Sequence, residues 1–185
     1  MRSRTSDPRR LDVQAFARES GSLEGTWPIA SLERLKSSLF RPDADAGHAR
    51  WAAHGETRKP NSLQPQTWLH LTAHASVELE CQRCLSAVRT ALDVDRFFHF
   101  VPGEDEAAEL DAEEEDDVLA LPRSLDLLEL VDEELLLALP IVPRHEHCPE
   151  PLPLKAEAEA GFADDESPHP FAALASLKRG PAGQN

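Results

Sequence analysis

Residues 68–81 read WLHLTAHASVELEC, an almost uninterrupted alternation of apolar and polar side chains. Leu69 and every second residue up to Cys81 are apolar, whereas His, Thr, Ser and Glu occupy most of the positions between them. Successive side chains of a β-strand point to opposite faces of the sheet, so the pattern predicts a long strand with one buried face. A strand of this length requires neighbouring strands and a covering layer, which makes this stretch decisive for the fold.

The same alternation resumes a few residues later. From residue 88 to residue 100, apolar side chains again recur at alternate positions, and the short connection between the two stretches contains CQRC, residues 81–84. Two alternating stretches separated by a short connection predict an antiparallel hairpin. Cys81 and Cys84 are therefore expected at the tip of that hairpin.

A helix is predicted further along the chain, over residues 126–139. Its apolar residues recur at the spacing of a helical stripe and are Leu128, Val131, Leu135 and Leu139. Asp126 is suited to cap its start, Pro140 ends it, and the carboxylates Glu129, Asp132 and Glu133 are expected on its solvated outer face. We therefore expect an α+β fold, in which an antiparallel, barrel-like sheet is covered by this helix and joined by disordered acidic segments.

The N-terminal part gives weaker signals. Ile29, Leu32, Leu35 and Leu39 share one helical stripe, which predicts a helix over about residues 29–39. Prolines and glycines then recur through residues 41–65, so little regular structure is expected there apart from a short strand around Trp51.

Charge is distributed unevenly along the chain, which has 185 residues and a net charge of −15. Residues 1–100 hold 14 Lys and Arg against 12 Asp and Glu, whereas residues 101–185 hold 5 against 22. Ten carboxylates fall within residues 104–117 with no cation among them. Repulsion between like charges predicts an extended, solvated loop over residues 103–118, with docking to a basic protein as the alternative.

The sequence predicts a division into two parts. Residues 1–150 form one α+β domain that includes the acidic loop, and residues 151–185 form a flexible acidic tether with a short C-terminal helix. An apolar stripe with an adjacent cation identifies this helix: Phe171, Leu174, Leu177 and Lys178. The helix is expected either to cover the core of the domain or to dock on a partner.

Neither an export signal nor a membrane span is predicted. The basic residues at the N-terminus are followed by a mixed polar segment, and the longest apolar stretch, residues 135–142, is interrupted by Pro140. A bilayer-spanning helix needs roughly 20 apolar residues. We expect a cytoplasmic protein, and its three cysteines suit a reducing compartment.

Three interpretations of the CxxC motif remain open. A structural zinc site needs four ligands, which Cys81 and Cys84 would share with Cys148 and either His147 or His145. A redox dithiol normally begins a helix, whereas this motif joins two strands. The third interpretation is a tight turn with buried thiols.

Three stretches in this order resemble the YceD family of bacterial large ribosomal RNA subunit accumulation proteins. They are LECQRCL (residues 79–85), DLLELVDEELLLALPIVPRHEHC (126–148) and PFAALASLK (170–178), and the resemblance covers residues 11–179. It implies a cytoplasmic factor without enzymatic activity, which supports the synthesis, processing or stability of large-subunit ribosomal RNA. No small-molecule substrate and no catalytic residue are expected.

The nature of the partner stays open at this point. Arg83, Arg89 and Arg96 flank the hairpin and are the candidate RNA-binding residues. A net charge of −15 opposes contact with phosphates, so a basic ribosomal protein or another assembly factor is the alternative partner. An interaction module and a zinc or redox protein using Cys81 and Cys84 are the competing functions.

Overall fold

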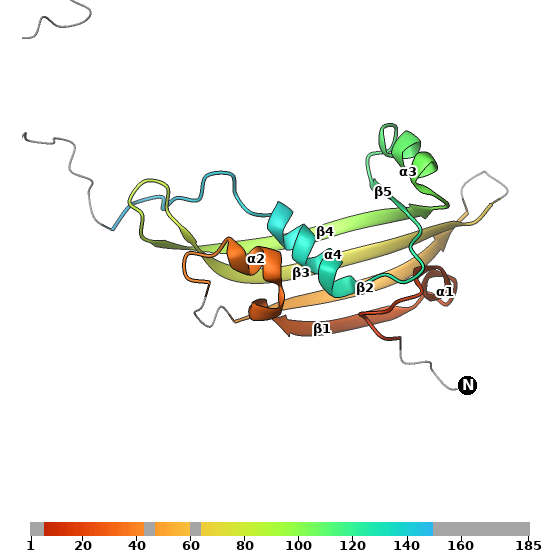
Figure 1. Ribbon diagram of the computed structural model, residues 1–185, viewed down its shortest axis with the longest axis horizontal. Helices are drawn as coiled ribbons and strands as arrows, with labels where there is room; N and C mark the ends of the chain where they lie inside the picture. Colours follow the sequence, from red (N-terminus) through yellow and green to blue (C-terminus); the bar gives the residue numbers. More distant parts are fainter. Residues whose placement is uncertain (1–5, 43–46, 60–63, 150–185) are drawn as a thin grey trace, which may run out of the picture. The chain divides into compact units, whose positions relative to one another are not determined.

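The alternating stretch that decides the fold lies in the middle of a five-stranded sheet (Figure 1). The computed structural model describes residues 6–42, 47–59 and 64–149. Strand β3 spans Gln66–Glu80 and pairs antiparallel with β4, Ala87–Val101. In the register of this pair Leu69 lies opposite Phe98, and Leu79 lies opposite Val88. The predicted hairpin, with the CxxC motif at its tip, is confirmed.

Three more strands extend the sheet. β2, His48–Arg58, pairs antiparallel with β3, and β1, Ser22–Pro28, pairs antiparallel with β2. On the other side, the short β5, Asp117–Ala120, runs parallel to β4. The order β1-β2-β3-β4-β5 makes an open, mixed sheet with β1 and β5 at its edges. The α+β class is confirmed. The sheet does not close into the expected barrel, because β1 and β5 do not pair with each other.

One face of the sheet carries the main core. Helix α4, Leu127–Leu137, begins at Asp126, whose side chain accepts a hydrogen bond from the backbone N–H of Leu128 at 2.9 Å. α4 and α2, Glu33–Ser37, cover this face together, and α1, Val13–Arg18, packs at its other end (Figure 1). The buried face of β3 supplies Leu69, Leu71 and Val77, as the alternation predicted. The helix expected over residues 126–139 is confirmed with slightly tighter bounds.

The N-terminal predictions need correction. The helix expected over residues 29–39 is divided into a 3-10 turn, Ile29–Ser31, and α2. Residues 48–58, expected to be largely irregular, form the full-length strand β2. Its core-facing positions include Ala49, Ala53 and Gly55, which give little hydrophobic signal. At Gly55 the lack of a side chain is required, because a Cβ atom there would lie 2.6 Å from the Phe16 ring.

The acidic stretch is more ordered than predicted. Helix α3, Glu104–Asp111, carries three carboxylates in its first turn, where they interact favourably with the helix dipole. Ala107 of α3 packs against Val101 and Val118 in a small separate core. Since Phe98 and Phe100 face the main core, the intervening β4 positions place this small core on the opposite face of the sheet.

The C-terminal predictions fall outside the described residues. Residues 150–185, including the predicted apolar stripe, lie beyond the part of the chain that the structure describes. The division of the chain near residue 150 stays a prediction. Among the described helices, none is long and apolar enough to cross a membrane.

Candidate metal centre

A tight connection at the hairpin tip holds the two cysteines of the CxxC motif. The backbone N–H of Cys81 donates to the carbonyl of Ser86 at 2.9 Å, and the N–H of Leu85 donates to the carbonyl of Cys81 at 2.8 Å. Leu85 adopts a φ of 58°, the left-handed conformation that such a turn requires. The turn leaves Cys81 fully buried and Cys84 half-buried.

The segment after α4 returns to this hairpin tip. The backbone N–H of Gln82 donates to the carbonyl of Pro143 at 2.8 Å, which joins the tip to the returning segment. Two residues further on, Nε2 of His145 lies 3.0 Å from the carbonyl oxygen of Ala87 at the start of β4. These two contacts bring His145 and Cys148 to the CxxC motif.

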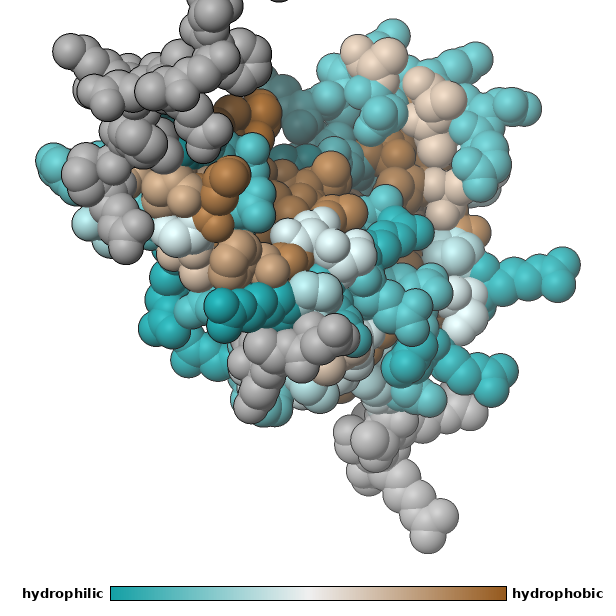
Figure 2. Space-filling model, turned by 60° about the vertical axis from the view of Figure 1, so that its left-hand side comes forward, coloured by the Kyte–Doolittle hydropathy of each residue, from teal (hydrophilic) through white to brown (hydrophobic). Residues whose placement is uncertain are grey.

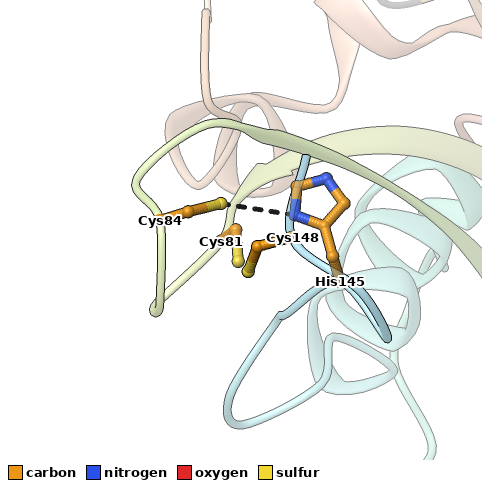
Figure 3. Close-up of side chains that lie close together, drawn as sticks. All are labelled: Cys81, Cys84, His145 and Cys148. Atoms are coloured by element: carbon orange, nitrogen blue, oxygen red, sulfur yellow. Dashed lines mark hydrogen bonds between the residues drawn. The ribbon is translucent and has the colours of Figure 1, made fainter. Parts of the chain in front are cut away.

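Four side chains from the two segments form a single group: Cys81, Cys84, His145 and Cys148 (Figure 3). Their ligand atoms all lie within 4.8 Å of one another, and Sγ of Cys84 is 3.4 Å from Nδ1 of His145. A tetrahedral zinc ion bonded to sulfur at about 2.3 Å keeps its ligand atoms about 3.8 Å apart. The group is therefore close enough to bind a metal ion after small movements of its side chains.

The donor set and its surroundings suit zinc. Three thiols and one imidazole make a Cys₃His set, which is a common structural zinc site, and all three cysteines are free of disulfides. With Nε2 directed at the Ala87 carbonyl, His145 has Nδ1 available for a metal ion. Metal-binding histidines usually donate their second ring N–H to such an acceptor, which fixes the tautomer and the ring orientation.

The thiols differ in their electrostatic surroundings. Burial opposes ionisation of Cys81, but hydrogen bonds from the backbone N–H groups of Cys84, His145 and Arg83 lower its pKa to about 5. Hydrogen bonds from the side chain and backbone of Ser86 lower the pKa of Cys84. Thiolates are the form that binds a metal ion, so the group favours a cation at its centre.

The other two members hold their protons more tightly. Burial and the neighbouring thiols Cys84 and Cys81 raise the pKa of Cys148. Hydrogen bonding to Cys81 raises the pKa of His145. A metal ion bound here would therefore displace protons from both residues, which makes its affinity depend on pH.

The structure brings together the three candidate cysteines Cys81, Cys84 and Cys148. Of the two candidate histidines, His145 supplies the imidazole of the group. His147, the other candidate histidine, is exposed and is not a member of the group. The sequence offered both histidines beside Cys148, and only the path of the returning segment distinguishes them.

The three candidate RNA-binding arginines do not form one surface. Arg83 is exposed at the hairpin tip, and Arg89 lies 3.7 Å from Glu78 on the exposed face of the sheet. Arg96, seven positions after Arg89, points to the opposite face and donates to Asp117 at 3.0 Å. The sheet therefore separates Arg96 from the other two.

Two carboxylates of α4 that the sequence did not single out as buried have special surroundings. Asp132, expected on the solvated face, is buried and accepts hydrogen bonds from the backbone N–H groups of Arg34 and Leu35 at 3.0 and 2.9 Å. Glu134 is also buried. Asp132 lies one residue from Val131 and three from Leu135, and this proximity to the apolar stripe was the only signal of its burial.

The fold and the site define a class of protein: an α+β domain with an open mixed sheet and a candidate Cys₃His metal centre at one hairpin tip. The chain belongs to the YceD family, because the family model described as "Large ribosomal RNA subunit accumulation protein YceD" matches residues 69–178. The large ribosomal RNA subunit accumulation protein YceD of Haemophilus influenzae is 36% identical over 163 residues, which cover 84% of this chain and 86% of that protein. No solved structure matches the chain.

The family match also shows which part of the fold is shared. Residues 69–178 contain β4, all but the first three residues of β3, helix α4 and all four members of the candidate metal centre. Strands β1 and β2 precede the matched region. The resemblance noted in the sequence is confirmed, and both segments that build the candidate metal centre lie inside it.

Proposed function

We propose that this protein is a ribosome-biogenesis factor that supports the synthesis, processing or stability of large-subunit ribosomal RNA. The observation that carries the proposal is family membership, together with the name of a relative that aligns with 84% of the chain. The proposed setting is the cytoplasm, where ribosomes are assembled. The proposed partner is large-subunit ribosomal RNA, a ribosomal protein or another assembly factor.

The factor is proposed to act by binding and without catalysis. Two histidine–aspartate pairs, His70–Asp95 and His74–Asp93, lie on the exposed face of the sheet at 2.6 and 2.7 Å. Neither imidazole contacts a hydroxyl or thiol nucleophile among the described residues, so the pairs lack the third member of a catalytic triad. They are better explained as cross-strand pairs that stabilise β3 and β4.

A structural zinc ion is proposed for the Cys₃His group. The supporting observation is the approach of all four ligand atoms from two segments that are distant in sequence. The set would leave no open coordination position, as is usual for structural rather than catalytic zinc. The ion would fasten the segment after α4 to the hairpin tip. The redox alternative has less support because the CxxC motif does not begin a helix.

Deletion of the gene in the parent bacterium tests the main proposal. We expect the ratio of large-subunit to small-subunit ribosomal RNA to fall, and to recover when the intact gene is supplied in trans. Quantification of both RNAs by gel or sequencing gives the ratio. An unchanged ratio in the deletion strain would reject the proposed function.

Crosslinking to RNA addresses the nature of the partner. If the protein contacts ribosomal RNA through the hairpin, ultraviolet crosslinking in cells gives a signal that falls when Arg83 and Arg89 are replaced by glutamate. Replacement of Arg96, which lies on the other face and is paired with Asp117, is the matched control. Absence of crosslinks from the unmodified protein would favour a protein partner.

A further inference from the structure

Strand β1 forms one edge of the sheet (Figure 1). Its seven residues pair with β2 in an unbroken antiparallel register, and no strand in the described part of the chain lies beyond it. A free edge exposes a row of main-chain N–H and C=O groups on which another strand can pair, and natural edges are often protected by lysine, proline or a bulge. β1 has no lysine and no bulge, and its one proline is the last residue, Pro28.

Two hydrogen bonds at the ends of this ladder show which main-chain groups of β1 face outward. The N–H of Gly55 donates to the carbonyl of Gly21 at 2.9 Å. At the other end, the N–H of Ile29 donates to the carbonyl of Gly47, also at 2.9 Å. Hydrogen-bonded pairs alternate along an antiparallel ladder, so the odd-numbered residues of β1 bond to β2. The N–H and C=O groups of the even-numbered residues therefore point away from the sheet.

The two edges of the sheet differ in how they are protected. At β5, which has four residues, the N–H of Val118 donates to the side chain of Asp111 of α3 at 3.0 Å. At β1, Glu24 and Thr26 are exposed, and their N–H groups have no hydrogen-bond partner among the described residues. Pro28 has no N–H, and its carbonyl already accepts the hydroxyl of Ser31 at 2.7 Å. The open groups of the β1 edge are therefore centred on residues 24–26.

Hydrophobic surface alone does not define this edge. Figure 2 shows hydrophobic side chains gathered in a recess, whereas the described side chains toward the lower margin, the side on which Figure 1 places β1, are mainly hydrophilic. Leu23 and Trp27 of β1 are half-buried on the face that α2 and α4 cover, and the Trp27 ring stacks on that of Trp51 with centroids 4.4 Å apart. A further strand would cover the exposed parts of both side chains, so pairing at this edge would combine main-chain hydrogen bonds with a small apolar contact.

The sequence of β1 is complementary to itself in one antiparallel register, in which Gly25 lies opposite Gly25 of a second copy. Glu24 then lies opposite Thr26 of the second copy, and the outward N–H and C=O groups of both residues form a hydrogen-bonded pair. Leu23 lies opposite Trp27 on the helix-covered face. A shift in one direction would place two Glu24 carboxylates opposite each other, and a shift in the other would place Glu24 opposite Pro28, which has no N–H to donate.

Charges on the opposite face of the sheet fit the same register. Arg50 of β2 lies beside Thr26, is exposed and belongs to no ion pair among the described residues. In the paired arrangement, Glu24 of the second copy lies on the other side of Thr26. The backbones of Arg50 and this glutamate are then two strand spacings apart, roughly 10 Å, which their long side chains can bridge above the smaller threonine. A two-fold axis produces this attraction twice.

We propose that β1 pairs antiparallel with β1 of a second copy of this chain, across a two-fold axis at Gly25. The two sheets then form one continuous sheet, with the helices of both copies on the same side. Glu24 and Thr26 supply the main-chain hydrogen bonds, and Leu23 and Trp27 of opposite copies cover each other. The inference goes beyond the proposed ribosomal role and does not depend on it, so either can fail alone.

The mass of the full chain in solution tests the inference. We expect analytical ultracentrifugation over a range of concentrations to show a reversible equilibrium between the monomer and a species of twice its mass. Thr26→Pro removes an outward N–H but leaves the bonds to β2 intact, so it should weaken the dimer about tenfold or more. Thr26→Val keeps this N–H and is the matched control, with an expected change of less than about twofold. Thermal unfolding of both variants as monomers verifies that each is folded.

Charge reversal tests the register. Glu24→Arg and Arg50→Glu each place like charges on facing positions, so each variant alone should dimerise more weakly than the unmodified chain. An equimolar mixture of the two variants should recover dimerisation, because in the mixed dimer each reversed position meets a charge of opposite sign. A mixture that stays as weakly associated as the separate variants would reject this register.

Other outcomes would overturn the inference. We expect the N–H groups of Glu24 and Thr26 to exchange their hydrogens more slowly as the protein concentration rises. Protection that is already complete in the monomer would mean that another segment of the same chain covers the edge. Protection that appears only when a second protein is added would assign the edge to that partner. A chain that is monomeric at every concentration, or a dimer that Thr26→Pro leaves unchanged, would reject pairing through β1.

Discussion

Nδ1 of His145 lies 3.4 Å from Sγ of Cys84, although 61 positions separate the two residues in the chain. The intervening residues include the whole of β4, α3, β5 and α4. The contact therefore depends on the correct assembly of the sheet and of the helix that covers it. A metal ion at this point would close a long loop, and crosslinks that close long loops restrict the unfolded chain strongly.

Metal analysis of two histidine variants tests the composition of the centre. We expect the protein purified under reducing conditions to carry one zinc ion per chain, and His145→Ala to lower its zinc affinity at least tenfold. His147→Ala removes the exposed neighbouring histidine and should keep the metal. Inductively coupled plasma mass spectrometry after dialysis measures the content. An unmodified protein without zinc would remove the metal centre from consideration.

Chelation of the metal should loosen the segment after α4. The N–H of Gln82, bonded to the carbonyl of Pro143, is expected to exchange its hydrogen faster when zinc is removed. The N–H of Leu11 is bonded to the carbonyl of Leu125 at the same distance of 2.8 Å and does not belong to the metal centre, so it serves as an internal control. Amide exchange followed by mass spectrometry or NMR measures both positions. Equal acceleration at both amides would mean that the whole fold, and not only the position of the segment after α4, depends on the metal.

The stability of the fold should depend on the ionisation of Glu134. Because its pKa is raised in the folded state, the folded protein binds more protons than the unfolded chain, and stability falls as the pH rises above about 4.3, the ordinary pKa of glutamate. Glu134→Gln should be more stable than the unmodified protein at pH 7. The difference in stability should vanish below about pH 4.3, where the glutamate is protonated in both the folded and the unfolded chain. Urea unfolding across the pH range measures this, with Glu133→Gln as the exposed control. A Gln variant that is less stable at neutral pH would contradict the explanation.

Asp132 should behave as a cap supplied from another helix. Its carboxylate accepts the N–H groups of Arg34 and Leu35 at the start of α2, where the local residue Leu32 provides no side-chain cap. Asp132→Ala leaves both donors unpaired and is expected to lower the free energy of unfolding by about 2 kcal/mol. Glu133→Ala, exposed on the same helix, should change it by less than about 0.5 kcal/mol. Denaturant unfolding of both variants measures the difference, and equal effects would argue against the capping role.

Strong local patterns predicted the centre of the fold. Alternation over β3 and β4 placed the hairpin and its tip correctly, and Asp126 with Pro140 marked the ends of α4. β2 was missed because its core face uses the small residues Ala49, Ala53 and Gly55, and the absence of a side chain at Gly55 is required by the Phe16 ring and not by the strand pattern. Such a requirement comes from a distant segment, so it leaves no periodic signal in the sequence.

The candidate metal centre was predictable only as a set of residues. The spacing of Cys81 and Cys84 indicated two ligands, and Cys148 with an adjacent histidine completed the count. The choice of His145 depended on a backbone hydrogen bond between Gln82 and Pro143 and on the Ala87 carbonyl. Neither contact follows from residue types, because each is made by main-chain atoms that every residue carries.

The distribution of the four centre residues along the chain fixes an order of events during translation. Cys81 and Cys84 are synthesised before β4 and can form the hairpin tip only once β4 has followed, and His145 and Cys148 follow only after β5 and α4 have been synthesised. The centre therefore closes only when residue 148 has emerged from the ribosome. Its closure marks the moment at which every strand and helix of the described domain has become available to fold.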